Sequence, residues 1–252
     1  MLISRPVGAD RPGWIMTVRF ARQLAAAAAV LALLAIPAGA PRAQVPPSER
    51  ELKIYAGLHA AAAQGDVAAI EQLIAAGEKP NLQDSKSRTP LIVAAFLHQH
   101  AAAEALLRLG ANPNARDADG YDALAIAAVD NDLETLKAVL AGGADPNVKI
   151  GFDNGSALIS ASQLGFVEIV RALIEAKADV DHANSRGWTA LITTVALGNG
   201  DKDHAAIVDA LIKAGANADI KDGSGRKAID YARARGYSDI VPILEKAAGR
   251  RS

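Results

Sequence analysis

A short apolar segment recurs along the chain at nearly constant spacing, and this regularity limits the possible folds more than any other feature. Its clearest copy reads TPLIVAA and starts at Thr89. Successive copies begin 33, 33, 34, 33 and 38 residues apart, at Ala56, Thr89, Asp122, Ser156, Thr189 and Lys227. Because the copies keep one register, the chain from about residue 48 to residue 248 is predicted to be a stack of similar units that pack on their neighbours.

Each unit is predicted to contain two helices. Most copies start with a side chain that can accept a hydrogen bond from the free N–H groups of a helix start, and Pro90 suits the first helical position. These predicted N-caps are Thr89, Asp122, Ser156 and Thr189. A second apolar run at helical spacing follows each start and predicts the second helix. Ahead of the first copy, Ser48 and Glu51 form a capping-box pattern that predicts an extended first helix from near Glu49.

A second landmark marks the predicted end of each second helix. It lies 21 residues after each of the first four starts and 26 after the fifth, at Gly77, Gly110, Gly143, Lys177 and Gly215. Glycine suits a left-handed backbone there, a conformation that costs other residues roughly 1 kcal/mol. Lys177 departs from the pattern, and we leave open whether it reflects tolerated sequence drift or a contact with a partner.

Two changes in spacing locate insertions. The fourth junction carries one extra residue within Lys149–Gly155, which predicts a longer hairpin there. Five extra residues around Gly198–Asp203 predict a loop between the two helices of the fifth unit. The acidic residues of that segment do not follow the calcium-loop pattern, so we expect a solvated loop, with contact to a partner as the alternative.

The pattern of TPLIVAA followed by GANPN, GGADPN or GANAD resembles the ankyrin repeat, whose unit is about 33 residues with a T-P-L-H-x-A signature. The resemblance implies an all-α fold: an ankyrin-repeat solenoid of six helix-turn-helix repeats joined by short β-hairpin loops. It also implies a non-catalytic module that binds a protein partner through the concave groove of the stack. The chain is similar in organisation to single-domain ankyrin proteins exported to the bacterial periplasm.

The first 43 residues have the layout of a signal peptide. Arg19 and Arg22 precede the uncharged run from Leu24 to Ile36, and a proline and small residues follow. The run is short for a membrane span, although a retained anchor is the alternative. We therefore expect residues 1–43 to be a signal region, with Met16 as a possible true start, and 44–252 to be the ankyrin domain. Cleavage is expected between Ala40 and Gln44, giving a periplasmic protein or, alternatively, a secreted one.

Composition and motifs argue against several other functions. The chain has no cysteine, and after residue 43 it carries 22 Lys/Arg against 27 Asp/Glu, which disfavours nucleic acid as a partner. Its histidines are scattered, so we expect no catalytic site, no cofactor and no metal. His59 occupies the signature position that implies a structural hydrogen bond. His98 and His100 are two residues apart and, on one helix, would diverge rather than share a metal.

The candidate partner-binding residues come from the resemblance, because the residue before each start would lie at a hairpin tip on the concave face. Aromatic and arginine side chains are common anchors of interfaces. We therefore expect Tyr121, Phe152 and Trp188 to be exposed and to line one surface. The predicted binding residues are Arg88, Tyr121, Phe152, Trp188 and Arg226, with Asp119, Asp153 and Arg186 as a polar rim. Packing of each ring on its own hairpin is the alternative.

The function predicted from the sequence is that of an exported adaptor or inhibitor that acts as a monomer on one protein partner of unknown identity. No stable membrane span is expected after cleavage. The alternative is a secreted effector that acts on a protein of a host or rival cell.

Overall fold

The computed structural model describes residues 44–249, and over that range it is helical. The predicted signal peptide lies outside the described residues, and so does its cleavage window apart from Gln44. Among the described residues, no helix is long and apolar enough to cross a membrane. The described part contains thirteen helices, which run from α2 (Glu49–Ile54) to α14 (Val241–Ala248).

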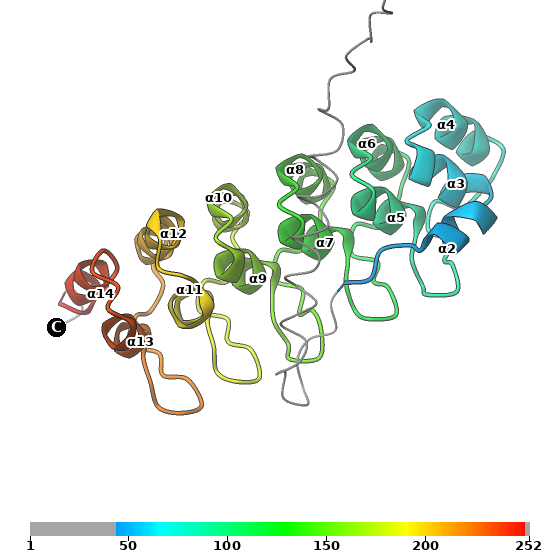
Figure 1. Ribbon diagram of the computed structural model, residues 1–252. Coiled ribbons are helices and arrows are strands. Elements are labelled where there is room, and N and C mark those ends of the chain that lie inside the picture. Colours follow the sequence, from blue (N-terminus) through cyan, green and yellow to red (C-terminus); the bar gives the residue numbers. More distant parts are fainter. Residues whose placement is uncertain (1–43, 250–252) are drawn as a thin grey trace, which may run out of the picture. The chain divides into compact units, whose positions relative to one another are not determined.

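Twelve of these helices form six antiparallel pairs that lie side by side (Figure 1). The first helices of the pairs are α3 (Gly57–Gln64), α5 (Pro90–Phe96), α7 (Ala123–Val129), α9 (Ala157–Leu164), α11 (Ala190–Leu197) and α13 (Ala228–Arg235). The second helices are α4 (Val67–Ala75), α6 (His100–Arg108), α8 (Leu133–Ala141), α10 (Val167–Glu175), α12 (Lys202–Lys213) and α14. Each first helix contacts the next first helix, and each second helix the next second helix. The predicted solenoid of six helix-turn-helix repeats is thereby confirmed.

The predicted helix caps are confirmed. Thr89, Asp122, Ser156 and Thr189 each accept a hydrogen bond from the backbone N–H three residues later, at the start of a first helix. Pro90 occupies the first turn of α5. These caps satisfy donors that would otherwise be buried without partners, since all four capping residues are buried.

The predicted left-handed turns are also confirmed. Gly77, Gly110, Gly143 and Gly215 have φ between 90° and 99°, and Lys177 has φ 65°. At the four glycines, nothing lies within 4 Å of the position that a Cβ would occupy. Lys177 therefore has room for its side chain, and its cost there is conformational.

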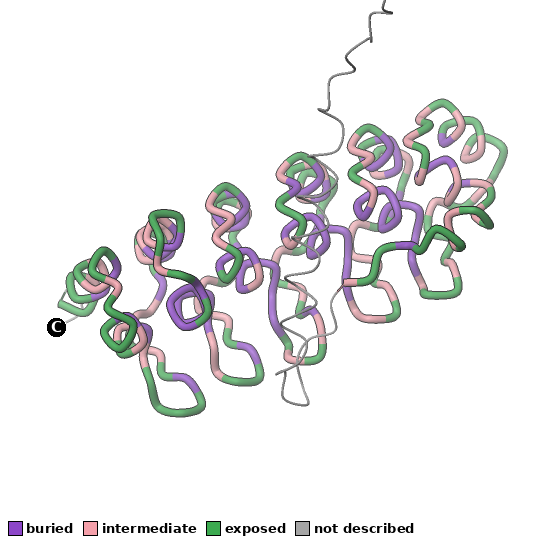
Figure 2. Tube along the Cα trace, in the orientation of Figure 1, coloured by how far each residue is buried: buried purple, intermediate pink, exposed green. Residues whose placement is uncertain are grey.

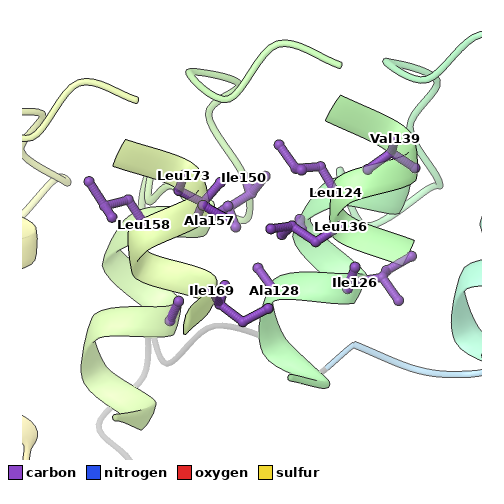
Figure 3. Close-up of a cluster of buried hydrophobic side chains, with 14 of the residues drawn as sticks. Leu124, Ile126, Ala128, Leu136, Val139, Ile150, Ala157, Leu158, Ile169 and Leu173 are labelled. Atoms are coloured by element: carbon purple, nitrogen blue, oxygen red, sulfur yellow. The ribbon is translucent and has the colours of Figure 1, made fainter. Parts of the chain in front are cut away.

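The core is built from small and aliphatic side chains between adjacent pairs. Figure 3 shows Leu124 and Leu136 of one pair facing Ala157, Ile169 and Leu173 of the next. All five are at most 3 % exposed. In Figure 2 the buried stretches lie where pairs face each other, while exposed residues cover the outer helix faces and the loops. Small residues on the first helices let neighbouring units approach closely.

The loops that join the pairs all project to the same side of the helices (Figure 1). Four of their tips close with a backbone hydrogen bond between residues four apart, from Asp84 to Arg88, Asp117 to Tyr121, Asn184 to Trp188 and Asp222 to Arg226. We call these segments the hairpin tips. The longer tip predicted within Lys149–Gly155 closes through an isolated antiparallel bridge between Ile150 and Gly155.

A row of side chains also links each unit to the next. The side-chain oxygen of Asn81 accepts a hydrogen bond from the N–H of Asn112 at 2.7 Å, and its amide donates to the Gly110 carbonyl at 3.3 Å. Asn114 and Asn147 repeat both bonds with the following unit. Asp181 occupies the last position and accepts from the N–H of Asn217 at 2.7 Å. We call this row the asparagine ladder.

Two expectations about length need correction. Ser48 and Glu51 do form a capping box, but α2 is a separate helix that ends at Ile54 rather than an extension of α3. The insertion near Gly198 is only partly a loop, because Asp201 caps α12, whose 12 residues exceed the nine of α10. Part of the inserted sequence is therefore the first turn of a longer helix.

Candidate functional site

The predicted binding residues lie at the hairpin tips, and one acidic or amide side chain organises each tip. Asp84 accepts hydrogen bonds from the N–H groups of Lys86 and Arg88 at 2.8 and 2.9 Å. Asp117, Asn184 and Asp222 do the same within their own tips. Because the same turn fixes Arg88, Tyr121, Trp188 and Arg226, their side chains leave the backbone at equivalent places.

Arg88 is not available to a partner, contrary to the prediction. It is 1 % exposed, its Nε donates to Asp84 at 2.9 Å, and its guanidinium also bonds the Glu51 carboxylate of α2. Tyr55, which follows α2, donates its hydroxyl to Asp84 at 2.7 Å. Arg88 thus attaches α2 to the first tip by joining Asp84 of its own tip to Glu51, which lies 37 residues away in sequence.

Tyr121 is also buried, at 7 % exposure, so the predicted exposed stripe of three aromatic rings is wrong. Its hydroxyl lies beneath the next tip, 3.4 Å from where a Cβ on Gly151 would stand. Burial raises the pKa of Tyr121, with nearby carboxylates adding to the effect. Asp119 beside it is half-buried. The ring therefore packs against the neighbouring hairpin, where glycine leaves it room.

Phe152 meets the expectation, since it is 69 % exposed. The neighbouring Asp153 holds the tip in place: its carboxylate accepts from the Asn184 amide at 3.2 Å, and its carbonyl accepts from the Ser185 N–H at 2.7 Å. Phe152 is therefore a large apolar side chain presented to solvent on an anchored hairpin.

Trp188 is half-buried and lies in a cluster that joins the last two tips. Its ring packs edge-on against Tyr231 of α13 with centroids 6.3 Å apart, and its Nε1 donates to Asp222 at 3.2 Å. The Tyr231 hydroxyl donates to the same carboxylate at 2.5 Å. Arg186 lies 5.7 Å above the Trp188 ring and Arg226 lies 5.6 Å above the Tyr231 ring. We call these five residues the aromatic–arginine cluster.

Asp222 is the centre of this cluster. Burial raises its pKa, but hydrogen bonds from the Tyr231 hydroxyl, from Ser224 and from the Arg226 N–H outweigh burial and hold the pKa well below its usual value. The carboxylate is therefore ionised at neutral pH and fixes both rings in place. The two arginines remain exposed on either side. The result is a set of interface-type side chains that are already ordered.

Tyr231 was missed by the sequence reasoning. It is the fourth residue after the start at Lys227, the position that Val93, Ile126, Ser160 and Thr193 occupy in other units. Comparing the fourth residue after each start across the units would have found one aromatic residue among aliphatic and hydroxyl side chains. Tyr231 is not the residue before the start of its unit, so the predicted binding residues did not include it.

The histidines divide into two groups. His59 behaves as predicted, with Nε2 2.9 Å from the Arg88 carbonyl of the next tip. The prediction that His98 and His100 diverge is wrong, because His98 is not on the helix. It has φ 52° in the turn before α6, and both rings face Asp132, at 3.0 and 3.1 Å.

Comparison with known proteins gives a consistent result. A family model described as ankyrin repeats (3 copies) matches residues 58–150, 130–222 and 158–249. The ankyrin repeat protein YahD of Escherichia coli K12 is 32 % identical over 91 residues, which are 36 % of this chain and 45 % of that protein. The chain thus spans less than half the length of this curated relative.

Two solved structures extend the likeness. An ankyrin repeat domain from Acinetobacter baumannii AYE has a TM-score of 0.73 and 37 % identity, covering 76 % of this chain and 97 % of that one. A chain from the complex of a predatory endopeptidase from Bdellovibrio bacteriovorus with an immunity protein has a TM-score of 0.64 and 26 % identity, covering 76 % and 98 %.

Proposed function

The chain belongs to the ankyrin-repeat family, and from that premise we propose that it is an exported, non-catalytic module that binds one protein through its C-terminal hairpin tips. The ankyrin-repeat fold is generally a non-catalytic interaction scaffold. Because one such scaffold carries many different partners, the choice of partner must depend on surface residues.

The observation that carries this proposal is the exposed, ordered surface of the last three tips. Phe152 offers an apolar anchor, and the aromatic–arginine cluster offers the exposed Arg186 and Arg226 next to its two rings. Side chains that are already held in place lose less conformational entropy on binding than free ones. The binding surface is therefore smaller than the sequence suggested: Phe152, Asp153, Arg186, Trp188 and Arg226 belong to it, together with Tyr231.

The remaining histidines support a non-catalytic role. His59, His182 and His204 each place a ring nitrogen within 3.2 Å of a backbone carbonyl. A general base needs its ring nitrogen near the hydroxyl or thiol that it activates. These three rings are committed to holding loops and helices together.

Location in the periplasm is part of the proposal. It is supported by the first 43 residues, in which two arginines are followed by an apolar run and then by small residues. The likeness to a chain from the complex of a predatory endopeptidase with an immunity protein supports binding to another protein. N-terminal sequencing of the protein from a periplasmic extract should show a first residue between Pro41 and Val45. A membrane-bound full-length chain, or recovery mainly from the culture medium, would reject the periplasmic assignment.

The binding surface can be tested by capturing the partner from periplasmic extract and measuring its affinity for purified variants. Phe152→Ala and Arg186→Ala should each weaken binding by roughly 2 kcal/mol, about 30-fold, if they are anchors. Both side chains are exposed, so the urea midpoint should stay close to that of the wild type.

Glu168→Ala is the matched control, because Glu168 is an exposed residue of a second helix away from the tips and forms an exposed ion pair with its neighbour Arg171 at 2.8 Å. It should leave affinity and stability nearly unchanged. If Phe152→Ala and Arg186→Ala bind the captured partner as tightly as this control, the hairpin tips are not the binding surface.

A further inference from the structure

Three metal-ligand side chains meet where the second helix pair packs on the third. His98 lies in the turn between α5 and α6, His100 is the first residue of α6, and Asp132 caps α8. His98 Nδ1 lies 3.0 Å and His100 Nε2 lies 3.1 Å from Asp132 Oδ2. One donor atom of each residue lies within 4.8 Å of the other two.

We propose that His98, His100 and Asp132 form a binding site for one divalent transition-metal ion, with Zn²⁺ as the best match. This site is separate from the hairpin tips and from protein binding. Two imidazoles and a carboxylate are a ligand set that zinc accepts. Zinc–ligand bonds of about 2.0–2.2 Å at tetrahedral angles put donor atoms about 3.3 Å apart, close to the 3.0 and 3.1 Å from the two ring nitrogens to Asp132. A solvent molecule would complete the coordination.

The backbone of His98 is the second argument. Its position is held by glycine in three other units, at Gly65, Gly165 and Gly236 with φ 71°, 79° and 69°, and by Asn131 with φ 55°. His98 adopts the same left-handed conformation with φ 52°. A histidine there carries a conformational cost that glycine avoids, and such a residue is often kept for its side chain.

The surroundings orient the other two ligands. His100 Nδ1 lies 3.0 Å from the Glu134 carboxylate, which directs Nε2 toward Asp132. Histidines that bind metals usually donate their second N–H to such a carboxylate. Asp132 is held by its capping bond, in which Oδ1 accepts from the Thr135 N–H at 3.0 Å. Its side chain is 5 % exposed, whereas those of His98 and His100 are 44 % and 33 % exposed, so an ion could enter from solvent.

A bound ion would add a link between two units that also pack together and share the ladder bonds of Asn114, because its ligands are 32 and 34 residues apart in sequence. An ion that binds only the folded array stabilises it by an amount that grows with the logarithm of the free metal concentration once that concentration exceeds the dissociation constant. The same distances also suit hydrogen bonds from both histidine rings to the Asp132 carboxylate without a metal. The experiment distinguishes this metal-free arrangement from a bound ion.

The test is calorimetric titration of ZnCl₂ into the purified, chelator-treated protein, with the melting temperature measured with and without zinc. The wild type should bind one Zn²⁺ per chain and melt at a higher temperature with zinc. His98→Gly restores the residue of the equivalent units, so its metal-free melting temperature should rise. Its zinc affinity should nevertheless fall at least about tenfold, as should that of His100→Ala.

His182→Gln is the matched control, since His182 contacts the Asn154 carbonyl in another part of the stack. This variant should keep the zinc response of the wild type. Zinc binding that is absent from the wild type, or that is equally strong in His98→Gly and in the wild type, would overturn the proposal. The melting temperature of metal-free His98→Gly is expected to rise. A variant with that melting temperature is folded, so its lost zinc response does not come from misfolding.

Discussion

Replacing Asp122 by threonine should stabilise the protein at neutral pH. Asp122 caps α7 with a bond of 2.8 Å from the Ala125 N–H, and it is 1 % exposed. Its other carboxylate oxygen is buried and has no hydrogen-bond partner among the described residues. Burial raises the pKa of Asp122 from 3.8 to about 6. Thr89 and Thr189 make the same cap in equivalent units, also at 1 % exposure, without a charge.

The size of the effect follows from that pKa. A carboxyl group whose pKa is raised on folding contributes stability below its unfolded pKa, and this stability is lost as the pH rises through the folded pKa. A rise of about 2 pKa units corresponds to about 3 kcal/mol at pH 7, at about 1.4 kcal/mol per unit. Since threonine keeps the cap, Asp122→Thr should gain roughly 1–3 kcal/mol at pH 7 and little near pH 4.

The assay is urea unfolding of both proteins at several pH values between about 4 and 7, the interval that spans the two pKa values. Thr89→Asp is the reciprocal control, because it places a carboxylate at the equivalent buried cap. It should lose stability, and the loss should grow with pH over the same interval. A gain for Asp122→Thr that is the same at both ends of the interval, or a loss at pH 7, would refute the reasoning.

Three further changes test the stack. Lys177→Gly should raise the urea midpoint by an amount equivalent to roughly 0.5–1 kcal/mol, because Lys177 has φ 65°; a lowered midpoint would contradict this. Leu158→Ala should cost roughly 2–5 kcal/mol in the same assay, since Leu158 is 1 % exposed in the middle of the array. Trp188→Ala should lower stability as well as partner affinity, because the ring packs on Tyr231 and bonds Asp222; an unchanged midpoint would contradict that packing.

The sequence predicted well the features that depend only on residues within one unit. A capping side chain such as Thr89 lies three residues from the N–H that it binds, and Gly110 or Lys177 follows a helix whose end determines its backbone. Such short-range requirements recur at every unit, so the repeat itself identified them.

The errors concern contacts between units. The family resemblance predicts Arg88 at the surface because it places the residue before each start on the concave face, but the side chain is buried and bonds Glu51 of α2. Tyr121 is buried because the next tip has Gly151 above its hydroxyl. His98 and His100 were treated as residues of one helix, whereas the left-handed turn at His98 redirects the first ring toward Asp132. In each case the decisive partner lies in a different unit, which periodicity within one unit does not identify.

The asparagine ladder has one weak junction. Asparagine can accept and donate, so Asn81, Asn114 and Asn147 each make two bonds to the following unit. Asp181 has no N–H in its side chain and can only accept, which leaves one bond between the fourth unit (α9–α10) and the fifth unit (α11–α12). In a one-dimensional array whose stability is a sum of nearest-neighbour terms, opening starts at the junction with the smallest term. The array should therefore open first between its fourth and fifth units, and each such opening would separate Phe152 from the aromatic–arginine cluster and from any protein bound across both.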